Sequence, residues 1–469
     1  MFKGRERELE AMERLYRRGD FQMIVIYGRR RVGKTSLIEK FCEGKRALMF
    51  MAQMQSDQGN LEEFSARVRR FFGEPTLAGR FESWSQAFDY LADHAGEDQI
   101  VVSLDEFPYA AQANPVLPSL LQIAIDERLK RSNIYLILCG SNQGFMENEV
   151  LAYKSPLYGR RTAQLKLAPF NYRDAALMVP KASPHDALLY YACVGGTPYY
   201  LSLIDQDVSF EQNMRNLFFE KTGLLYEEPD LLLRQELREP ALYSSILRAV
   251  AGGATKPTQI ADKAGMARSS VMKYLHTLVD LQILCKRIPF GENPATSRKG
   301  IYELADPCFA FWYRMVARYL PEIESDRGGL IAAQALRHER LSTYVGRRFE
   351  EVCGQWVGDQ AAAGALPIEV YAVGSWWGAD PVRHEQTDID VLGADTYGRT
   401  ALIGECKWRD TFDETEAIEG LRDKARLLSG WEVTDFYLFS KGEVSAATRR
   451  KYAGDDRMHF VTLDDLYAS

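Results

Sequence analysis

The stretch GRRRVGKT, residues Gly28 to Thr35, decides the fold of the first part of the chain. It fits the pattern G-x-x-x-x-G-K-[ST] and directly follows the apolar run QMIVIY (22–27), which predicts a buried strand. The segment SLIEKF (36–41) then continues with apolar residues at helical spacing. A glycine-rich turn between a strand and a helix presents backbone N–H groups to an anion. The stretch therefore predicts a phosphate-binding loop.

The residue types of this loop match the chemistry of a nucleoside phosphate held with Mg²⁺. Gly28 and Gly33 lack a Cβ atom, so a phosphate chain can lie against the backbone at the tight turns. We expect Lys34 to reach the β- and γ-phosphate oxygens and the Thr35 hydroxyl to ligate Mg²⁺. The predicted nucleotide-binding residues of the loop are Gly28, Arg31, Val32, Gly33, Lys34, Thr35 and Ser36.

A second element is expected downstream, where a buried strand ends in a carboxylate for the metal. The run IVVSLDE (100–106) supplies this pattern. Asp105 is expected to hold Mg²⁺ through water, and Glu106 to polarise the attacking water as a general base. The run therefore predicts the catalytic edge of the same sheet.

Two further polar segments are candidates for contact with the phosphates. A third apolar run (134–139) ends in GSN, where Ser141 or Asn142 would meet the γ-phosphate or the water, with a plain strand-ending turn as the alternative. The segment SPLYGRR presents Arg160 and Arg161. An arginine can stabilise transition-state charge from the same or a neighbouring subunit, and Arg160 is the catalytic candidate. Ordinary surface ion pairs are the alternative for both arginines.

These motifs, taken in order, resemble the archaeal-type ATPase family, which lies within the AAA-like and STAND (signal-transduction, numerous-domain) P-loop ATPases. The resemblance covers residues 1–235 and rests on FKGRERELE, GRRRVGKTSL, VVSLDEFPY, LILCGSN, SPLYGRR and GGTPYYL. It implies a three-layer P-loop core with a helical lid, ATP or ADP bound with Mg²⁺, and ATP hydrolysis. It also implies that Phe2, Gly4 and Arg5 lie near the adenine and that Pro198 packs near the base. A helix-ending turn is the alternative for GGTP.

The middle of the chain is basic. Residues 241–290 carry seven basic and two acidic side chains, so their net charge of +5 contrasts with −7 for the whole chain. Helical spacing over 242–250, a helix TQIADKAG capped by Thr258, a second helix opened by Ser269 and Ser270, and the strand-like ILCKRIPF predict a winged helix-turn-helix. It resembles the module that follows the lid in the same ATPase family.

Two uses of this module remain open. For DNA binding, the second helix would present Arg268, Ser269, Ser270, Lys273 and His276, while Lys286 and Arg287 would contact backbone phosphate. The alternative is a protein–protein joint within a multidomain ATPase. The aromatic segment that follows, with Phe309, Phe311, Trp312 and Tyr313, predicts a packed joint to the next domain.

Near the C-terminus, charged residues fall on two segments that alternate polar and apolar positions. TDIDVLG (387–393) and ALIGECKW (401–408) predict a hairpin around DTYGR. If its centre falls between Tyr397 and Gly398, Asp390 lies opposite Glu405 and Asp388 lies opposite Lys407, all on one face. Carboxylates crowded in this way repel each other unless a cation lies between them.

This cluster resembles the PD-(D/E)XK, or restriction-endonuclease-like, nuclease core. The resemblance implies that Asp390 and Glu405 ligate Mg²⁺ and that Lys407 activates the attacking water. A preceding amphipathic helix (344–357) would add Glu350 as a further catalytic acid. Ile389 stands where the family has proline. The region also resembles the domain of unknown function that commonly ends archaeal-type ATPases. The alternative is an inactive nuclease fold that only binds.

Composition limits the remaining function classes. The chain has 469 residues, of which 46% are hydrophobic and 26% charged, values typical of folded globular domains. Its apolar runs are far shorter than the roughly 18–20 residues of a membrane span. The seven cysteines are scattered and form no CxxC pair, which argues against a disulfide framework or a cysteine-rich zinc site. We therefore expect a cytoplasmic protein without a membrane partner.

Together these patterns predict an α/β multidomain protein in five parts. They are a P-loop ATPase core (1–165), a helical lid (166–236), a winged helix-turn-helix (237–298), a helical connector (299–340) and a PD-(D/E)XK nuclease-like α/β domain (341–469). The expected function is ATP hydrolysis coupled to DNA binding and metal-dependent cleavage, with ATP or ADP, DNA and a second copy of the chain as partners. The alternative is a nucleotide-dependent switch or scaffold whose nuclease-like domain is non-catalytic.

Overall fold

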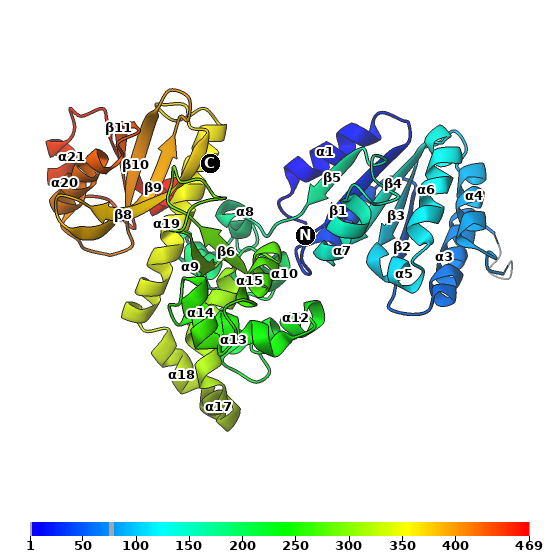
Figure 1. Cartoon of the computed structure of the whole chain (residues 1–469), viewed down its shortest axis with the longest axis horizontal. Coiled ribbons are helices and arrows are strands. Elements are labelled where there is room, and N and C mark those ends of the chain that lie inside the picture. Colours follow the sequence, from blue (N-terminus) through cyan, green and yellow to red (C-terminus); the bar gives the residue numbers. More distant parts are fainter. Residues whose placement is uncertain (1, 75–78, 469) are drawn as a thin grey trace. The chain divides into compact units, whose positions relative to one another are not determined.

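The computed structural model describes residues 2–74 and 79–468 of the chain. The chain folds into two compact units. The first unit is Met1–Phe170 with Thr197–Tyr199, and the second is Asn171–Gly196 with Tyr200–Ser469. Figure 1 labels many of the elements of both units. Within the described residues, none of the helices combines the length and the apolar character needed to cross a bilayer.

The first unit is built on a five-stranded parallel sheet with the strand order β2-β3-β4-β1-β5. The predicted strands at 22–27, 100–106 and 134–139 are confirmed as β1, β3 and β4. The bounds of the strands are β1 Gln22–Tyr27, β2 Ala47–Met51, β3 Ile100–Asp105, β4 Ile134–Gly140 and β5 Ala163–Lys166. The main helices are α1 Glu6–Tyr16, α2 Lys34–Cys42, α3 Asp57–Phe71, α4 Trp84–His94, α5 Phe107–Ala113 and α6 Leu117–Glu127.

Helices cover both faces of this sheet. Met23 and Val25 of β1 pack into an apolar cluster with residues of α3, α4 and α6. Ile24 and Ile26 point to the other face and pack with residues of α1 and α2. Because neighbouring strand residues face opposite sides, an uninterrupted apolar run such as β1 is the pattern expected of a strand buried on both faces. The expected α/β core with a parallel sheet is therefore confirmed.

The second unit begins with helices and continues into the winged helix-turn-helix. Its first helices include α8 Tyr172–Ala176, α9 Pro184–Val194, α11 Phe210–Phe218 and α12 Glu228–Glu236. The winged module comprises α13 Pro240–Ala251, α14 Pro257–Ala264, α15 Val271–Asp280 and the antiparallel strands β6 Leu284–Arg287 and β7 Ile301–Leu304. Phe309, Phe311, Trp312 and Tyr313 are buried, which agrees with the predicted packing role.

Two details of the winged module differ from the expectation. Helix α14 begins at Pro257, with Lys256 at the N-cap, so Thr258 lies inside the first turn and is not the cap. Proline is favoured at the first helical position because its missing N–H would be unpaired there anyway. The wing extends past residue 298, because its second strand, β7, follows a long loop after β6 and lies within the range assigned to the helical connector.

The C-terminal part of the second unit is a mixed sheet with the strand order β12-β11-β10-β9-β8. Strands β8, β9 and β10 pair antiparallel, whereas β10, β11 and β12 pair parallel. The bounds are α19 His338–Ala362, β8 Ala372–Asp380, β9 Glu385–Ala394, β10 Thr400–Lys407, α20 Glu414–Lys424, β11 Glu432–Ser440, α21 Ala446–Lys451, β12 Met458–Thr462 and α22 Leu463–Tyr467.

The predicted hairpin register is confirmed. Val391 pairs with Gly404, and Ala394 pairs with Ala401. The next pair outward in this antiparallel register is Asp390 and Glu405. A one-residue slip would have moved one of them to the other face of the sheet, so this register is what brings the two acids together.

The phosphate-loop glycines can be tested through stability. A Cβ atom on Gly28 would lie 2.3 Å from the carbonyl oxygen of Leu167, and its φ is +154°. Gly28→Ala should therefore lower the free energy of unfolding by about 2 kcal/mol or more, because a backbone atom cannot give way. Gly19→Ala is the matched control, since Gly19 has φ +72° and nothing within 4 Å of its Cβ position.

The measurement is urea unfolding of both variants and the parent, followed by circular dichroism. The control should lose only about 1 kcal/mol, the cost of the backbone conformation alone. Equal losses in the two variants would contradict the close approach of Gly28 to Leu167.

Candidate functional site

The side chain of Lys34 folds back onto the backbone of the phosphate loop. Helix α2 begins at Lys34, and Gly33 before it has a φ of 88°. The Lys34 ammonium donates hydrogen bonds to the carbonyl oxygens of Gly28 at 2.9 Å and Arg29 at 3.1 Å. The side chain is buried. A buried cation at the N-terminus of a helix, where the first backbone N–H groups have no partner within the helix, is suited to an anionic ligand.

The loop is tied to the end of β3. The Thr35 hydroxyl donates a hydrogen bond of 2.8 Å to Asp105 Oδ2. Thr35 opens α2 and Asp105 ends β3, so one contact joins the two elements that the sequence predicted to share a metal. A hydroxyl and a carboxylate oxygen are the hard ligands that Mg²⁺ prefers. The donor set therefore fits a nucleoside triphosphate bound with Mg²⁺.

Glu106 follows on the same strand end and is held by β4. Its φ of 49° places the backbone in the left-handed region, where a non-glycine residue is strained. Ser141 donates to Glu106 Oε2 from its hydroxyl at 2.8 Å and from its backbone N–H at 3.2 Å. Asn142 instead accepts from the N–H of Phe145 and caps a short helix. Of the two candidates, Ser141 is thus the one that meets Glu106.

The GGTP segment ends a helix and also supplies residues that lie against the loop. Helix α9 ends at Val194, and Gly195 has a φ of 80°, as the turn interpretation expected. A Cβ on Gly33 would lie 3.7 Å from Pro198 Cγ. The buried Arg29 donates to the Thr197 hydroxyl at 3.0 Å. The two interpretations of GGTP are therefore compatible. The Arg29–Thr197 contact was not anticipated, since a loop arginine is indistinguishable in sequence from an exposed one.

The N-terminal box contacts the loop from the other direction. Arg5 donates to the carbonyl oxygens of Val32 at 3.2 Å and Ala168 at 2.5 Å. Its guanidinium also lies 4.6 Å from the centre of the Phe170 ring. Arg5 thus holds the backbone of the loop, a role that supports the shape of the site. Phe2 packs on the apolar cluster under α1 and α2.

Arg160 and Arg161 lie in ordinary interactions. Arg160 donates to Asp126 from Nε at 3.0 Å and from Nη2 at 2.6 Å. This hydrogen bond to Arg160 is the main cause that lowers the pKa of Asp126 to about 2. Arg161 donates to the carbonyl oxygen of Leu151 at 3.3 Å. Arg160 is thus ion-paired with Asp126. To stabilise the transition state of ATP hydrolysis, Arg160 would have to leave Asp126.

The exposed face of the helix-turn-helix carries most of the expected residues. Ser269, Lys273, His276 and Lys286 are exposed, and Arg268 is exposed while paired with Asp262 at 2.6 Å. Arg287 departs from the expectation that it contacts phosphate. Its guanidinium is half-buried, pairs with Glu303 at 3.0 Å and donates to the Ser375 hydroxyl. Because this donor fork is already engaged within the protein, Arg287 is not a free phosphate contact.

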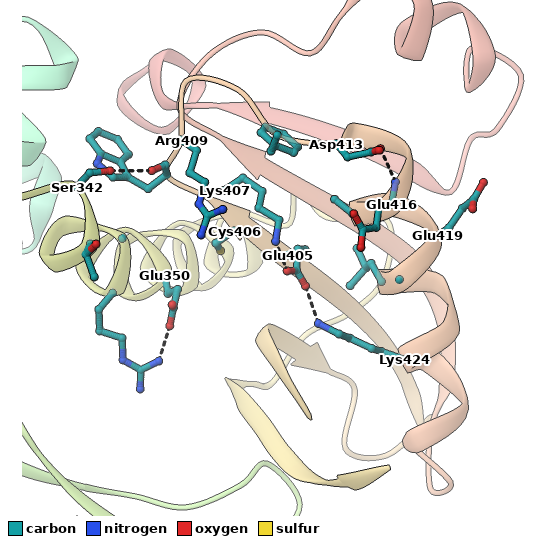
Figure 2. A pocket seen from close by; sticks show the side chains of 18 of the residues that line it. Ser342, Glu350, Glu405, Cys406, Lys407, Arg409, Asp413, Glu416, Glu419 and Lys424 are labelled. Atoms are coloured by element: carbon teal, nitrogen blue, oxygen red, sulfur yellow. Dashed lines mark hydrogen bonds and ion pairs between the residues drawn. The ribbon is translucent and has the colours of Figure 1, made fainter. Parts of the chain in front are cut away.

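The C-terminal acids lie side by side on the sheet. Asp390 accepts a hydrogen bond of 2.8 Å from the backbone N–H of Cys406. Glu405 receives two ammonium groups, Lys407 at 2.6 Å on Oε1 and Lys424 at 2.8 Å on Oε2, as Figure 2 shows. The predicted Glu405–Lys407 proximity is observed. Lys424 comes from α20 and was not anticipated, because no motif spacing links it to the acids.

Charge and burial act on the two acids in opposite ways. Burial raises the pKa of Asp390 far above its usual range, and the charges of Glu405 and Glu350 add to this shift. Burial would raise the pKa of Glu405 as well, but the positive charges of Lys424 and Lys407 overcome it and lower the pKa. Asp390 is therefore the acid that lacks a compensating cation.

Glu350 joins the acids from helix α19. It lies beside Arg347, to which it is ion-paired. Burial raises its pKa to about 7 against the opposing charge of Arg347. It lines a cavity of about 880 Å³ that also includes Arg383, Glu405, Lys407, Arg409 and Lys424. Figure 2 shows Glu350 and Glu405 projecting into this cavity from the helix and from the sheet.

Asp388 does not share the larger cavity with Lys407. It pairs with Trp377 of β8 and lines a smaller cavity of about 120 Å³ with Asp390 and Glu350. Within residues 2–74 and 79–468, no group of three or more His, Cys, Asp and Glu side chains is placed to hold a metal ion. The acid site thus offers Asp390 and Glu405 as an oxygen pair, with Glu405 neutralised by lysines.

Three family models match the chain in the order of its parts. The model described as an ATPase domain predominantly from Archaea matches residues 2–204. The IclR helix-turn-helix domain matches residues 244–286. The model described as archaeal and bacterial proteins of unknown function matches residues 312–418. The expected ATPase and helix-turn-helix modules are confirmed, and none of these descriptions names a nuclease.

Individual proteins agree with this order. The uncharacterized protein MJECL04 of Methanocaldococcus jannaschii is 30% identical over 413 residues, or 88% of this chain and 89% of that protein. The uncharacterized ATP-binding protein MJ0423 of the same organism is 52% identical over 46 residues, or 10% of this chain and 78% of that protein. The solved structure of the Walker-type ATPase PABY2304 of Pyrococcus abyssi has a TM-score of 0.50 at 19% identity, covering 67% of this chain and 96% of that one.

At that identity the likeness to the solved structure shows the fold alone. The relative that matches almost end to end and the ordered family models together go further. The chain therefore belongs to the archaeal family of P-loop ATPases in which the ATPase domain is followed by an IclR-type helix-turn-helix and a C-terminal domain of unknown function.

Proposed function

We propose that the protein hydrolyses ATP at the phosphate loop, binds DNA with its winged helix, and cleaves DNA at the C-terminal acids in a metal-dependent reaction. A helical lid would then span residues 166–236, the winged helix would extend to Leu304 at the end of β7, and a nuclease-like domain would span residues 341–469. One observation carries the hydrolytic part: Thr35 meets Asp105 while Ser141 meets Glu106 at the ends of neighbouring strands. Loop, metal ligands and base thus share one edge of the sheet.

Each residue of this edge has a distinct task in hydrolysis. When ATP is bound, Mg²⁺ neutralises phosphate charge. Lys34 exchanges its two backbone carbonyl partners for phosphate oxygens. Thr35 and Asp105 would hold Mg²⁺. Glu106 accepts the proton of the attacking water, and Ser141 orients the Glu106 carboxylate. Thr197 and Pro198 lie against the loop, and Pro198 would pack near the adenine base of the nucleotide.

Lys34→Ala should reduce the rate of ATP hydrolysis at least about 100-fold, because one fixed positive charge on the transferred phosphoryl group is lost. Lys40→Ala is the matched control. Lys40 lies on the same helix but is exposed and pairs with Glu43. The measurement is steady-state phosphate release with Mg²⁺-ATP. Equal rates for Lys34→Ala and Lys40→Ala would contradict the assignment of the loop.

The winged helix supports DNA binding through exposed polar and basic groups. Lys273 and His276 lie on α15, and Lys286 lies on β6, all exposed. The module has a net charge of +5 in an otherwise acidic chain, so a local electrostatic footprint is available. Binding through such phosphate contacts should weaken as salt rises, with a slope of log K against log salt of about −0.9 for each phosphate contacted.

The nuclease proposal rests on the pair Asp390 and Glu405. Their register places both acids on one face. Burial and neighbouring negative charge raise the pKa of Asp390, and a divalent cation bound there would offset this negative charge. Lys407, at 2.6 Å from Glu405, is the group to orient the attacking water. Glu350 would complete the acid set after leaving Arg347.

A second function is favoured by the two lysines on Glu405. Because Lys407 and Lys424 already neutralise this carboxylate, the domain is also suited to bind nucleic acid without cutting it. The protein would then be a nucleotide-dependent switch or scaffold, in which ATP hydrolysis times the bound state.

Lys407→Ala separates the two functions. The parent should nick plasmid or degrade single-stranded DNA with Mg²⁺ or Mn²⁺ and ATP, and the variant should lose at least about 100-fold of that rate, because the attacking water is no longer oriented. Lys451→Ala, on the exposed side of α21, is the control of the same domain. If parent and both variants leave DNA intact while ATP is hydrolysed, the non-catalytic function holds instead.

A further inference from the structure

The wing of the helix-turn-helix is bonded to the C-terminal sheet. The backbone N–H of Phe290 donates to the carbonyl oxygen of Ser375 in β8 at 2.8 Å, and Arg287 donates to the hydroxyl of the same serine. The Phe290 ring meets the Trp431 ring at 5.7 Å between centres. A Cβ on Gly374 would lie 3.0 Å from Phe290 Cδ2, so the backbone of β8 approaches the wing closely.

A chain of charged groups runs from the wing to an acid of the candidate site. Arg287 of β6 pairs with Glu303 of β7 at 3.0 Å. Glu303 also accepts two hydrogen bonds from Arg347 of α19, at 2.9 Å and 3.0 Å. Arg347 in turn is paired with Glu350. Two arginines therefore share Glu303, and Arg347 is divided between a wing carboxylate and a site carboxylate.

The wing also forms a wall of the site itself. The cavity of about 120 Å³ that is lined by Asp390, Asp388 and Glu350 is also lined by Arg287 and Ile301, one residue from each wing strand. A displacement of the wing would change both the shape of this cavity and the partners of Arg347.

The direction of this effect follows from charge pairing. In a half-buried network, a carboxylate that loses one partner draws more strongly on the other, because an uncompensated charge is costly away from water. If Arg287 moves off Glu303, Glu303 should hold Arg347 more tightly and Glu350 should lose it. Glu350 would then become a free anion beside Asp390.

We infer that nucleic acid bound at the wing is linked to cation binding at the acid site through Glu303, which positions Arg347 and thereby Glu350. This inference rests on the proposed function of the acid site. Phosphates that bind the exposed Lys286 displace β6, so that Arg287 leaves Glu303, Glu350 is released and the affinity of the acids for a divalent cation rises. Thermodynamic linkage requires the reverse as well, so a bound cation should tighten DNA binding by the same factor.

The test is Mn²⁺ binding to the full chain, measured by calorimetry with and without a saturating DNA duplex of about 20 base pairs. Asp390→Asn identifies the part of the isotherm that belongs to the acid site. In the parent, the duplex should lower the Mn²⁺ Kd about fivefold or more. In Glu303→Gln the change should be less than about twofold. Arg287→Gln, which cuts the chain at its other end, should show the same loss.

Glu292→Gln is the matched control. Glu292 lies in the same wing but pairs with Lys299 at 2.7 Å, away from the chain of charges, so this variant should keep the full parental linkage. Thermal unfolding of each variant verifies that it is folded. Linkage that persists in both Glu303→Gln and Arg287→Gln would overturn the inference. So would a parent that binds Mn²⁺ and duplex independently. If the parent has no Mn²⁺ binding that Asp390→Asn removes, the proposed function of the acid site fails, and the inference fails with it.

Discussion

The hydrogen bond from the Thr35 hydroxyl to Asp105 is the contact on which the site of the first unit depends. It joins the start of α2, the helix that follows β1, to the end of β3, and β4 lies between β1 and β3 in the sheet. The carboxyl ends of β1, β3 and β4 meet at one edge because the sheet is parallel. The near-continuous apolar runs of these strands are typical of a parallel sheet that is buried on both faces. With the edge formed, Ser141 reaches Glu106 and the loop closes around Lys34.

In the second unit, the negative charges of the buried acids are balanced by groups of the protein itself. Glu405 takes two lysines, Glu350 takes Arg347, and Asp390 takes only a backbone N–H. Arg347 is shared with Glu303 of the wing. The same ion pairs that neutralise the acids thus attach the helix-turn-helix to them. Through Arg347, the pairing of the acids is in this way connected to the wing.

Local patterns were enough for much of this picture. The strand, loop and helix around Gly28, the order of the ATPase motifs, and the pairing of Asp390 with Glu405 followed from spacing, since each depends on neighbours in sequence or on a short hairpin. The partners of charged side chains did not follow. Three such pairings depend on tertiary contacts between distant elements: Lys424 with Glu405, Arg287 with Glu303 and Ser375, and Arg160 with Asp126. The sequence alone does not indicate which partner a lysine or arginine will have.

We assign ATP turnover to the edge formed by Asp105, Glu106 and the loop. Glu106→Gln tests it most directly, because the amide keeps the shape of the side chain and removes its basicity. We expect this variant to bind Mg²⁺-ATP with a Kd within about threefold of the parent and to release phosphate at least about 100-fold more slowly. A parent that shows no heat of nucleotide binding, or a variant that hydrolyses ATP at the parental rate, would contradict it.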